Sequence, residues 1–366
     1  MGKINVTKSS LPPFEEYCDE IKSIWDSRWL TNAGPKHQLL ESELKSFLGT
    51  KHVCLFANGH LALEYALESF GFEPGSEVIT TPFTFVSTVN AIVRKSLIPV
   101  FCDISPEDYT IDVKKIEHLI TKKTVAILPV HVYGHLCNFE EIKKIAHKYN
   151  LKVIYDGAHA FGERLNGKGV SKYGDITMFS FHATKVFNTI EGGALCFDND
   201  KFKPILDTSR NFGIVSEEEC LYFGGNAKMN EFQAAMGLCN LRYVKDNIKK
   251  RKKLYELYTK RLSNINGIIL PCLKDNISYN YSYIPVRFCN YKFSRDEIKE
   301  RLNKANIFSR KYFYPAVNEF ECFKKRNYPG ETPIAKMISE QVLTLPLYPD
   351  LDQKTVKIIC DIILSN

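Results

Sequence analysis

The sequence predicts an α/β fold, with a mostly parallel central sheet in a large domain and a smaller α/β domain at the C-terminus. Between residues 51 and 197, short apolar β-rich runs alternate with amphipathic helical segments. The runs are apolar throughout, which is typical of parallel strands covered by helices on both faces. After a long helical stretch and a turn-rich region the pattern changes. We therefore expect a large domain over residues 1–250 and a small one over residues 251–366.

The expected elements follow in order along the chain. The strands are expected at His52–Phe56, Glu77–Thr80, Ile98–Cys102, Val125–Val130, Lys152–Asp156, Ile176–Phe181 and Gly193–Phe197. Helices are expected between them at Leu61–Phe70, Phe85–Arg94, Asp112–Leu119 and Phe139–Tyr149. A long helix from Asn230 to Leu262 precedes a strand at Tyr281–Phe288 and helices at Ser294–Lys304, Thr332–Gln341 and Leu351–Ile363. Ligands of such sheets bind beyond the carboxyl ends of the strands, so the residues after each strand are the candidates for a site.

Composition and cysteine spacing narrow the class of protein. The chain is 44% hydrophobic and 25% charged, as globular proteins are. Its longest apolar runs are far shorter than the roughly 20 residues that span a bilayer, and its N-terminus has no signal-peptide stretch. The eleven cysteines are scattered singly without a Cys-x-x-Cys pair. We therefore expect free thiols in a reducing cytoplasm, with no metal site and no membrane partner.

The net charge of +7 is spread along the chain. A diffuse positive charge suits an anionic substrate, but it does not indicate a nucleic-acid partner.

Two of the candidate segments are weak when taken alone. Asn58-Gly59-His60 ends the first strand and enters a helix, where free backbone N–H groups and the helix dipole favour a phosphate. The same tripeptide is equally an ordinary helix entry. Phe85 follows the second strand, where an aromatic ring would cover a planar cofactor or simply pack in the core.

Asp156 is a stronger candidate, because it places a carboxylate at the end of a hydrophobic strand, where a charge needs a partner. A protonated pyridine nitrogen would be such a partner, and that pair would keep a pyridoxal ring cationic. His159 would orient Asp156 or the ring hydroxyl. The alternative is a helix N-cap, a position that aspartate also favours.

The segment from Ser180 to Lys185 carries the prediction of pyridoxal 5′-phosphate (PLP). Ser180 ends a strand and would bind a phosphate, while Lys185 follows in a polar loop beside it. Desolvation and nearby positive charge would lower the pKa of Lys185, so that its amine attacks an aldehyde. A lone loop lysine is usually a surface residue. The joint occurrence of a phosphate seat, an aromatic residue, an aspartate and a lysine, each after a strand, indicates the PLP site instead.

Taken together, these segments resemble the DegT/DnrJ/StrS sugar aminotransferases, from residues 29–35 to residues 345–348. The segments that carry the resemblance are Asn58-Gly59-His60, Thr81–Phe85, Asp156–Ala160, Ser180–Lys185 and Met229–Ala235. The resemblance implies the aspartate-aminotransferase-like fold of PLP enzymes (fold type I). It also implies an enzyme that aminates keto sugars attached to nucleotides.

The resemblance implies that four side chains contact the cofactor ring or its aldehyde carbon. Lys185 is the Schiff-base lysine and carries the proton between the amino-donor carbon and the cofactor carbon. Asp156 pairs with the ring nitrogen, Phe85 stacks on the ring, and His159 lies near the ring hydroxyl.

By the same resemblance, Gly59, His60 and Ser180 hold the phosphate. Asn226, or Lys228 beside it, reaches the phosphate from the neighbouring subunit, so a homodimer with shared active sites is implied. Position 60 is commonly Thr or Ser in the family, and His60 leaves the side-chain role at this position open.

Within the family, residues 29–35 and 185–193 are most similar to members that aminate carbon 4 of dTDP-4-keto-6-deoxy-D-glucose. With L-glutamate as donor, the products are dTDP-4-amino-4,6-dideoxy-D-glucose and 2-oxoglutarate, and the sugar is destined for a surface polysaccharide. Relatives that aminate carbon 3 share most of the motifs and remain the alternative. The candidate substrate contacts are Thr31, Asn32, Arg210, Arg310 and Tyr314.

Three other classes fit the sequence less well. Sugar dehydratases of this fold have a histidine where Lys185 stands. A non-catalytic regulator would not need both Lys185 and Asp156. A dinucleotide-dependent oxidoreductase lacks support, because no Gly-x-Gly-x-x-Gly follows the early strands.

Overall fold

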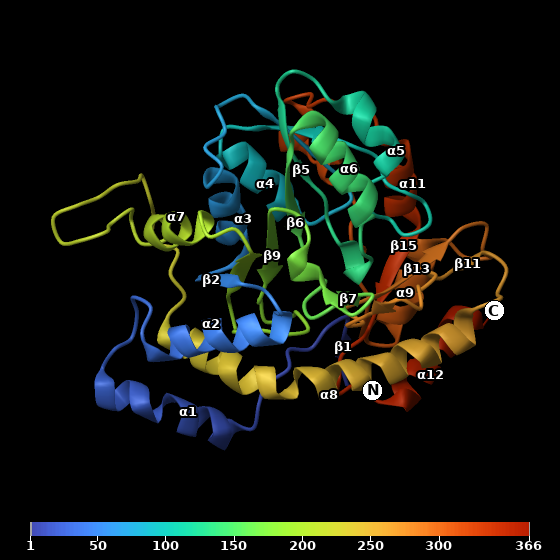
Figure 1. The fold of residues 1–366 in the computed structure, drawn as a ribbon. Helices are drawn as coiled ribbons and strands as arrows, with labels where there is room; N and C mark the ends of the chain where they lie inside the picture. The colour runs from blue at the N-terminus through green and yellow to red at the C-terminus, as the bar shows by residue number, and fades with distance from the viewer. Residues whose placement is uncertain (1, 366) are drawn as a thin grey trace.

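A seven-stranded sheet forms the centre of the computed structural model, which describes residues 2–365 (Figure 1). Its strand order is β2-β10-β9-β6-β5-β3-β4, and only β10 runs antiparallel to its neighbours. The strands are β2 (His52–Phe56), β3 (Glu77–Thr80), β4 (Ile98–Phe101), β5 (Thr124–Leu128), β6 (Lys152–Asp156), β9 (Ile176–Ser180) and β10 (Gly193–Phe197). The mostly parallel sheet is therefore confirmed, and the expected strands are present within about two residues at their ends.

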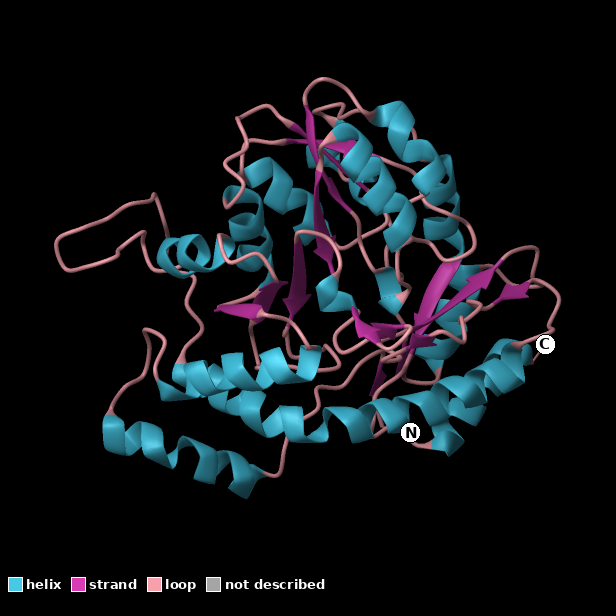
Figure 2. Ribbon diagram, viewed as in Figure 1, coloured by secondary structure: helices cyan, strands magenta, loops and turns pink. Residues whose placement is uncertain are grey.

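Helices cover both faces of this sheet (Figure 2). Successive strand residues point to opposite faces, so Val53 and Leu55 enter one core while Cys54 and Phe56 enter the other. The second core is closed by α3 (Gly59–Glu68), α4 (Val86–Arg94) and α7 (Phe202–Ser209). The first is closed by α2 (Pro35–Leu48), α5 (Val113–Ile116), α6 (Phe139–Tyr149) and α8 (Glu231–Leu262). This two-sided burial is the reason that the strands are apolar throughout.

The long helix α8 connects this body to a C-terminal unit with its own core. Its residues up to Val244 pack on the large sheet, whereas those from Leu254 onward pack in the C-terminal unit. That unit contains the antiparallel sheet β11 (Ile268–Ile269), β13 (Ile284–Phe288) and β15 (Val342–Leu345), with α9 (Arg295–Lys304) and α12 (Gln353–Leu364). The N-terminal strand β1 (Ile4–Asn5) pairs with β14 (Ile307–Phe308) of the same unit, so the chain start does not lie with the large body.

The other elements are short or peripheral. α1 (Phe14–Ser27) lies beside α8 and is tied to it by Arg242, which pairs with Glu16 and Glu20. The rest are β7 (Arg164–Leu165), β8 (Lys168–Gly169), β12 (Ile277–Ser278), α10 (Glu321–Lys324) and α11 (Pro333–Gln341). Within residues 2–365, no helix combines the length and the apolar character needed to cross a membrane.

Candidate functional site

A cavity of about 480 Å³ opens at the carboxyl edge of the central sheet. Five parallel strands, β2, β3, β5, β6 and β9, end there, and the segment after each of them lines the cavity. The sequence candidates in its wall are Gly59, His60, Phe85, Asp156, His159, Ser180 and Lys185. The structure thus brings together every residue predicted to hold the cofactor from within one chain.

Lys185 lies in the loop between β9 and β10 and lines the cavity. Desolvation lowers the pKa of its amine to about 8, against a weaker opposing effect of the Asp156 carboxylate. At pH 7 roughly a tenth of the amine is then neutral, whereas an ordinary lysine is almost wholly protonated. Lys185 is therefore a usable nucleophile and base near neutral pH.

Asp156 is buried at the end of β6, with only 5% of its surface exposed. One carboxylate oxygen accepts a hydrogen bond from Thr88 Oγ1 at 2.7 Å, and the other accepts one from the Ala158 backbone N–H at 3.1 Å. Burial raises the pKa of this carboxyl, and the two hydrogen bonds oppose that rise. The N-cap alternative is wrong, because the turn after β6 does not lead into a helix. No ion pair of Asp156 is present within residues 2–365, although the charge of Lys185 acts on this carboxylate and lowers its pKa.

His159 is buried and its tautomer is fixed by the backbone. Its Nδ1 accepts a hydrogen bond from the Tyr133 N–H at 3.0 Å. Burial, together with the charge of Lys185, holds the pKa of the imidazole well below its ordinary value, so the ring is neutral. A neutral ring that accepts at Nδ1 carries its proton on Nε2. His159 can therefore donate one hydrogen bond to a ligand oxygen in the cavity.

The floor of the cavity contains the helix entry at Gly59. The Asn58 side chain caps α3 by accepting from the Leu61 N–H at 2.9 Å. A Cβ atom at Gly59 would lie 3.0 Å from the Ser180 Cβ, so this position has room only for glycine unless Ser180 moves. The first-turn N–H groups of α3 and the Ser180 hydroxyl therefore border one small space, which suits an anion.

Several lining residues were not anticipated from the sequence. Thr88 lies one helical turn after Phe85, a spacing that would have signalled a shared face. Tyr283, Tyr312 and Phe313 enter from the C-terminal unit. The sequence had pointed to this unit only through Arg310 and Tyr314, which flank Tyr312 and Phe313. Phe85 itself is 58% exposed, so its ring forms an open wall and is not core packing. The remaining lining residues that were not predicted are Asn58, Thr84, Ser87, Val130, Ala158, Met178, His182, Thr184 and Glu191.

The other predicted residues lie outside this cavity in the single chain. Thr31, Asn32 and Tyr314 are exposed, and Arg310 lies over the ring of Tyr312 at 5.3 Å, beside the cavity rim. Asn226 bridges to Asn211 at the base of an extended loop, next to Lys228. None of these residues touches the space between Lys185 and Gly59.

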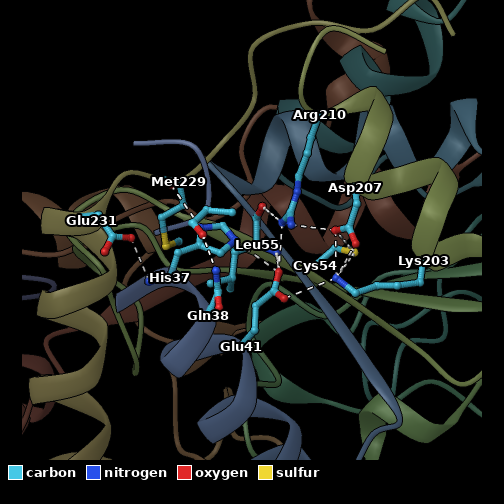
Figure 3. Close-up of polar contacts among 11 residues, drawn as sticks. His37, Gln38, Glu41, Cys54, Leu55, Lys203, Asp207, Arg210, Met229 and Glu231 are labelled. Atoms are coloured by element: carbon cyan, nitrogen blue, oxygen red, sulfur yellow. Dashed lines mark hydrogen bonds and ion pairs between the residues drawn. The ribbon is translucent and has the colours of Figure 1, made fainter. Parts of the chain in front are cut away.

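Arg210 is not available to a substrate in this structure. It is 5% exposed, and its guanidinium bonds Glu41 at 3.1 Å, Asp207 at 2.7 Å and the Leu55 carbonyl at 2.6 Å (Figure 3). Lys203 completes the cluster by bonding both carboxylates. The Arg210 guanidinium is enclosed by these protein acceptors, so its N–H donors are not available to a substrate. The role of Arg210 is therefore structural.

The same region fixes the start of α2 against α8. The Glu231 carboxylate, on α8, accepts from the backbone N–H groups of Lys36 and His37 at 2.7 and 2.9 Å (Figure 3). A carboxylate at a helix N-terminus satisfies unpaired donors and complements the helix dipole.

Residues 2–365 contain no group of three or more His, Cys, Asp and Glu residues placed to hold a metal ion.

Comparisons with known proteins agree with this geometry. A model of the DegT/DnrJ/EryC1/StrS aminotransferase family matches residues 14–364. A dTDP-4-amino-4,6-dideoxy-D-glucose transaminase of Shigella dysenteriae is 40% identical over 97% of both chains. A transaminase of the same name from Escherichia coli is 42% identical, over 99% of this chain and 98% of the relative.

Solved structures give the same answer for the fold. DesI, crystallised in the presence of its TDP-sugar product, superposes with a TM-score of 0.94 at 27% identity, over 99% of this chain and 92% of the other. PseC of Helicobacter pylori, an aminotransferase involved in the biosynthesis of pseudoaminic acid, superposes with a TM-score of 0.93 at 26% identity, over 99% and 98%. The aminotransferase fold predicted from the sequence is therefore confirmed.

Proposed function

The chain belongs to the DegT/DnrJ/EryC1/StrS aminotransferase family, and we propose that it aminates carbon 4 of dTDP-4-keto-6-deoxy-D-glucose. The proposed substrate is supported by similarity to two enzymes named for the 4-amino-4,6-dideoxy product. This chain is 40% and 42% identical to them over nearly its whole length. Amination of a 3-keto sugar is the second candidate, since the cavity residues described above do not distinguish neighbouring ring carbons.

The cofactor of this aminotransferase is PLP, and the cavity fits it. Asp156 provides a buried carboxylate that a protonated ring nitrogen would pair with. Phe85 provides an open aromatic wall, and Gly59 lets the first turn of α3 approach Ser180 closely, beside which a phosphate would bind. When bound, the cofactor supplies an electron sink that stabilises negative charge on the carbon that loses its proton.

Lys185 moves the proton in both halves of the proposed reaction. Its Nζ would hold the cofactor. The amine, once neutral and free, would accept a proton from the carbon of the amino donor and deliver it again within the cavity. In the second half, with the keto sugar, the same atom carries the proton in the opposite direction. A pKa near 8 suits this work, because the amine then changes its protonation state at little cost near neutral pH.

Asp156 and His159 support this proton transfer without reacting themselves. The Thr88 and Ala158 hydrogen bonds orient Asp156 and favour its ionised form, which in turn keeps a ring nitrogen protonated. His159 presents its Nε2–H to the ring hydroxyl, where a donor favours the ionised oxygen. Both residues are buried, so water competes little for these contacts.

We propose L-glutamate as the amino donor and a homodimer as the active form. The loop after α7 projects from the body (Figure 1), and it carries exposed apolar side chains at Phe212, Leu221, Tyr222 and Phe223. Phe223 is fully exposed, which is unfavourable unless a partner covers it. A two-fold arrangement that buries this loop would bring Asn226 or Lys228, at its base, to the partner's phosphate seat.

A cytoplasmic location is proposed because all eleven cysteines are free thiols.

The activity is tested by incubating the purified protein with PLP, L-glutamate and dTDP-4-keto-6-deoxy-D-glucose. The nucleotide sugar is followed by mass spectrometry, with Lys185→Ala as the control. We expect an aminated sugar and 2-oxoglutarate from the wild type and neither from the variant. NMR of the product then identifies the aminated carbon. Consumption of glutamate without an aminated 4-keto sugar would favour the 3-keto substrate, which is then tested in the same way.

A further inference from the structure

The structure points to Ser87 as the hydroxyl that binds the cofactor phosphate in place of a side chain at position 60, with His60 as its positioning residue. This inference rests on the proposed PLP site. His60 and Ser87 both line the cavity, from the first turns of α3 and α4. His60 carries no hydroxyl of its own, and its ring is bonded to the Ser87 hydroxyl instead.

Both ring nitrogens of His60 are engaged. Nδ1 lies 2.9 Å from Ser87 Oγ, and Nε2 lies 2.9 Å from Glu64 Oε1. Glu64 is itself buried and also bonded by Arg94. Burial alone would raise the pKa of Glu64, but the hydrogen bonds from His60 and Arg94 outweigh it and lower that pKa. Glu64 is therefore an ionised acceptor, and His60 carries a proton on Nε2.

The state of Nδ1 then decides what Ser87 offers to the cavity. If Nδ1 is unprotonated, the Ser87 hydroxyl donates to it and has only lone pairs for a ligand. If Nδ1 carries a proton, His60 donates to Ser87 Oγ, and the Ser87 hydroxyl proton is free to point into the cavity. A phosphate accepts but does not donate when it is a dianion, so it favours the second arrangement. In that arrangement His60 donates from both ring nitrogens, from Nε2 to Glu64 and from Nδ1 to Ser87.

Ser87 lies beside the proposed phosphate site at the first turn of α3. The first turn of α3 contacts Ser180 through Gly59 and Ser87 through His60. The two hydroxyls therefore flank the same helix entry. The N-terminus of α4, where Ser87 lies, adds a second positive helix end to that of α3. A simple surface ion pair between His60 and Glu64 would not require the second bond to a hydroxyl inside the cavity.

The test compares PLP with pyridoxal, which lacks the phosphate. Dissociation constants are measured from the visible absorption of full-length protein that has been stripped of cofactor and retitrated. The variants are Ser87→Ala, His60→Ala, His60→Asn, and Ser87→Ala combined with His60→Thr. Ser69→Ala is the matched control, because the Ser69 hydroxyl donates to the Ala66 carbonyl at 2.8 Å, at the far end of α3.

We expect Ser87→Ala to weaken PLP binding about tenfold, as for loss of a hydrogen bond to a charged group, and to leave pyridoxal binding unchanged. His60→Ala should resemble it. His60→Asn should restore most of the loss, because an amide N–H replaces Nδ1–H. His60→Thr should rescue Ser87→Ala by supplying its own hydroxyl. The ³¹P resonance of bound PLP should shift in Ser87→Ala but not in Ser69→Ala.

The inference is overturned if Ser87→Ala leaves PLP binding unchanged, or if it weakens PLP and pyridoxal equally. It is also overturned if His60→Asn binds PLP no better than His60→Ala. These failures leave the proposed function intact, provided that the wild type binds PLP. A wild-type protein that binds neither ligand would refute the proposed function, and this inference with it.

Discussion

Thr88 gives the sharpest test of how the cofactor's partner is organised. Its hydroxyl donates to Asp156 at 2.7 Å and is itself 2.9 Å from the Thr84 hydroxyl, with all three side chains buried. Thr88→Val keeps the shape of the side chain and removes the donor. The Asp156 carboxylate then keeps only the Ala158 N–H, so desolvation raises its pKa further and its orientation loosens.

The size of the effect follows from the kind of bond that is lost. A hydrogen bond to a charged group contributes about 1.5–3 kcal/mol, which corresponds to roughly ten- to a hundredfold in an equilibrium. Part of this lost free energy should be recovered when a cationic cofactor ring pairs with Asp156. We therefore expect the half-reaction with glutamate to slow by about tenfold, near the lower end of that range.

The assay is stopped-flow absorbance of the cofactor after mixing the variant with glutamate, together with thermal unfolding. Thr88→Ser is the control, since it retains the hydroxyl, and it should react at nearly the wild-type rate. Equal rates for Thr88→Val and the wild type would refute the argument that this hydrogen bond keeps Asp156 ionised and aligned. A rate lost equally in Thr88→Ser would show that packing, and not the hydroxyl, is responsible.

Three further predictions concern other parts of the molecule. The rate at which cofactor-free protein binds PLP at Lys185 should rise with pH through about 8 and then level off, since only the neutral amine reacts. A rise that begins only near the pKa of an ordinary lysine would contradict the claim that desolvation lowers the pKa of Lys185. Glu41→Gln should lower the free energy of unfolding by about 3 kcal/mol, because it leaves Arg210 buried with one carboxylate fewer. Burial would raise the pKa of Glu41, but the hydrogen bond with His37 and the charges of Arg210 and Lys203 outweigh it and hold that pKa below its ordinary value. The difference in stability should therefore be full at neutral pH and shrink as the pH falls below that ordinary value, and denaturant titration at two pH values checks the sign. Phe223→Asp should shift the protein toward monomer in analytical ultracentrifugation and reduce activity in parallel, whereas an active monomer would exclude the shared site.

Much of the central body could be predicted from local pattern. The strands of a doubly covered sheet are short and apolar, so β2, β6 and β10 are visible as uninterrupted runs bounded by polar turns. Their ends also located the site, because the carboxyl edge of a parallel sheet collects the residues that follow each strand. This reasoning identifies Lys185 and Asp156 from the sequence, and both line the cavity.

Three helices of eight residues or more were not predicted: α1, α2 and α7. α2 does carry a local signal, because Leu40, Leu44 and Leu48 form a buried stripe at helical spacing. α1 and α7 lack such a signal. In α1 only Ile24 is fully buried, and the helix is held by ion pairs to α8 instead of by an apolar stripe. Its environment is set by residues more than 200 positions away, which no local pattern encodes. α7 follows the polar turn at residues 198–200 and has only a short apolar face.

The site was only partly predictable for the same reason. Tyr283 and Tyr312 reach the cavity because the C-terminal unit folds back over the sheet edge. The pairing of His60 with Ser87 depends on two helix entries that lie 27 residues apart. Arg210 shows the opposite error, since a basic residue that looks available in the sequence is enclosed by Glu41 and Asp207.

Borohydride trapping shows whether this cavity binds PLP through Lys185. Wild-type protein loaded with PLP is reduced, digested and examined by mass spectrometry, with Lys185→Ala treated in parallel. We expect a single phosphopyridoxyl group on the peptide that contains Lys185, and its loss in the variant. A modified lysine elsewhere, or no modification of a protein that still aminates the sugar, would contradict it.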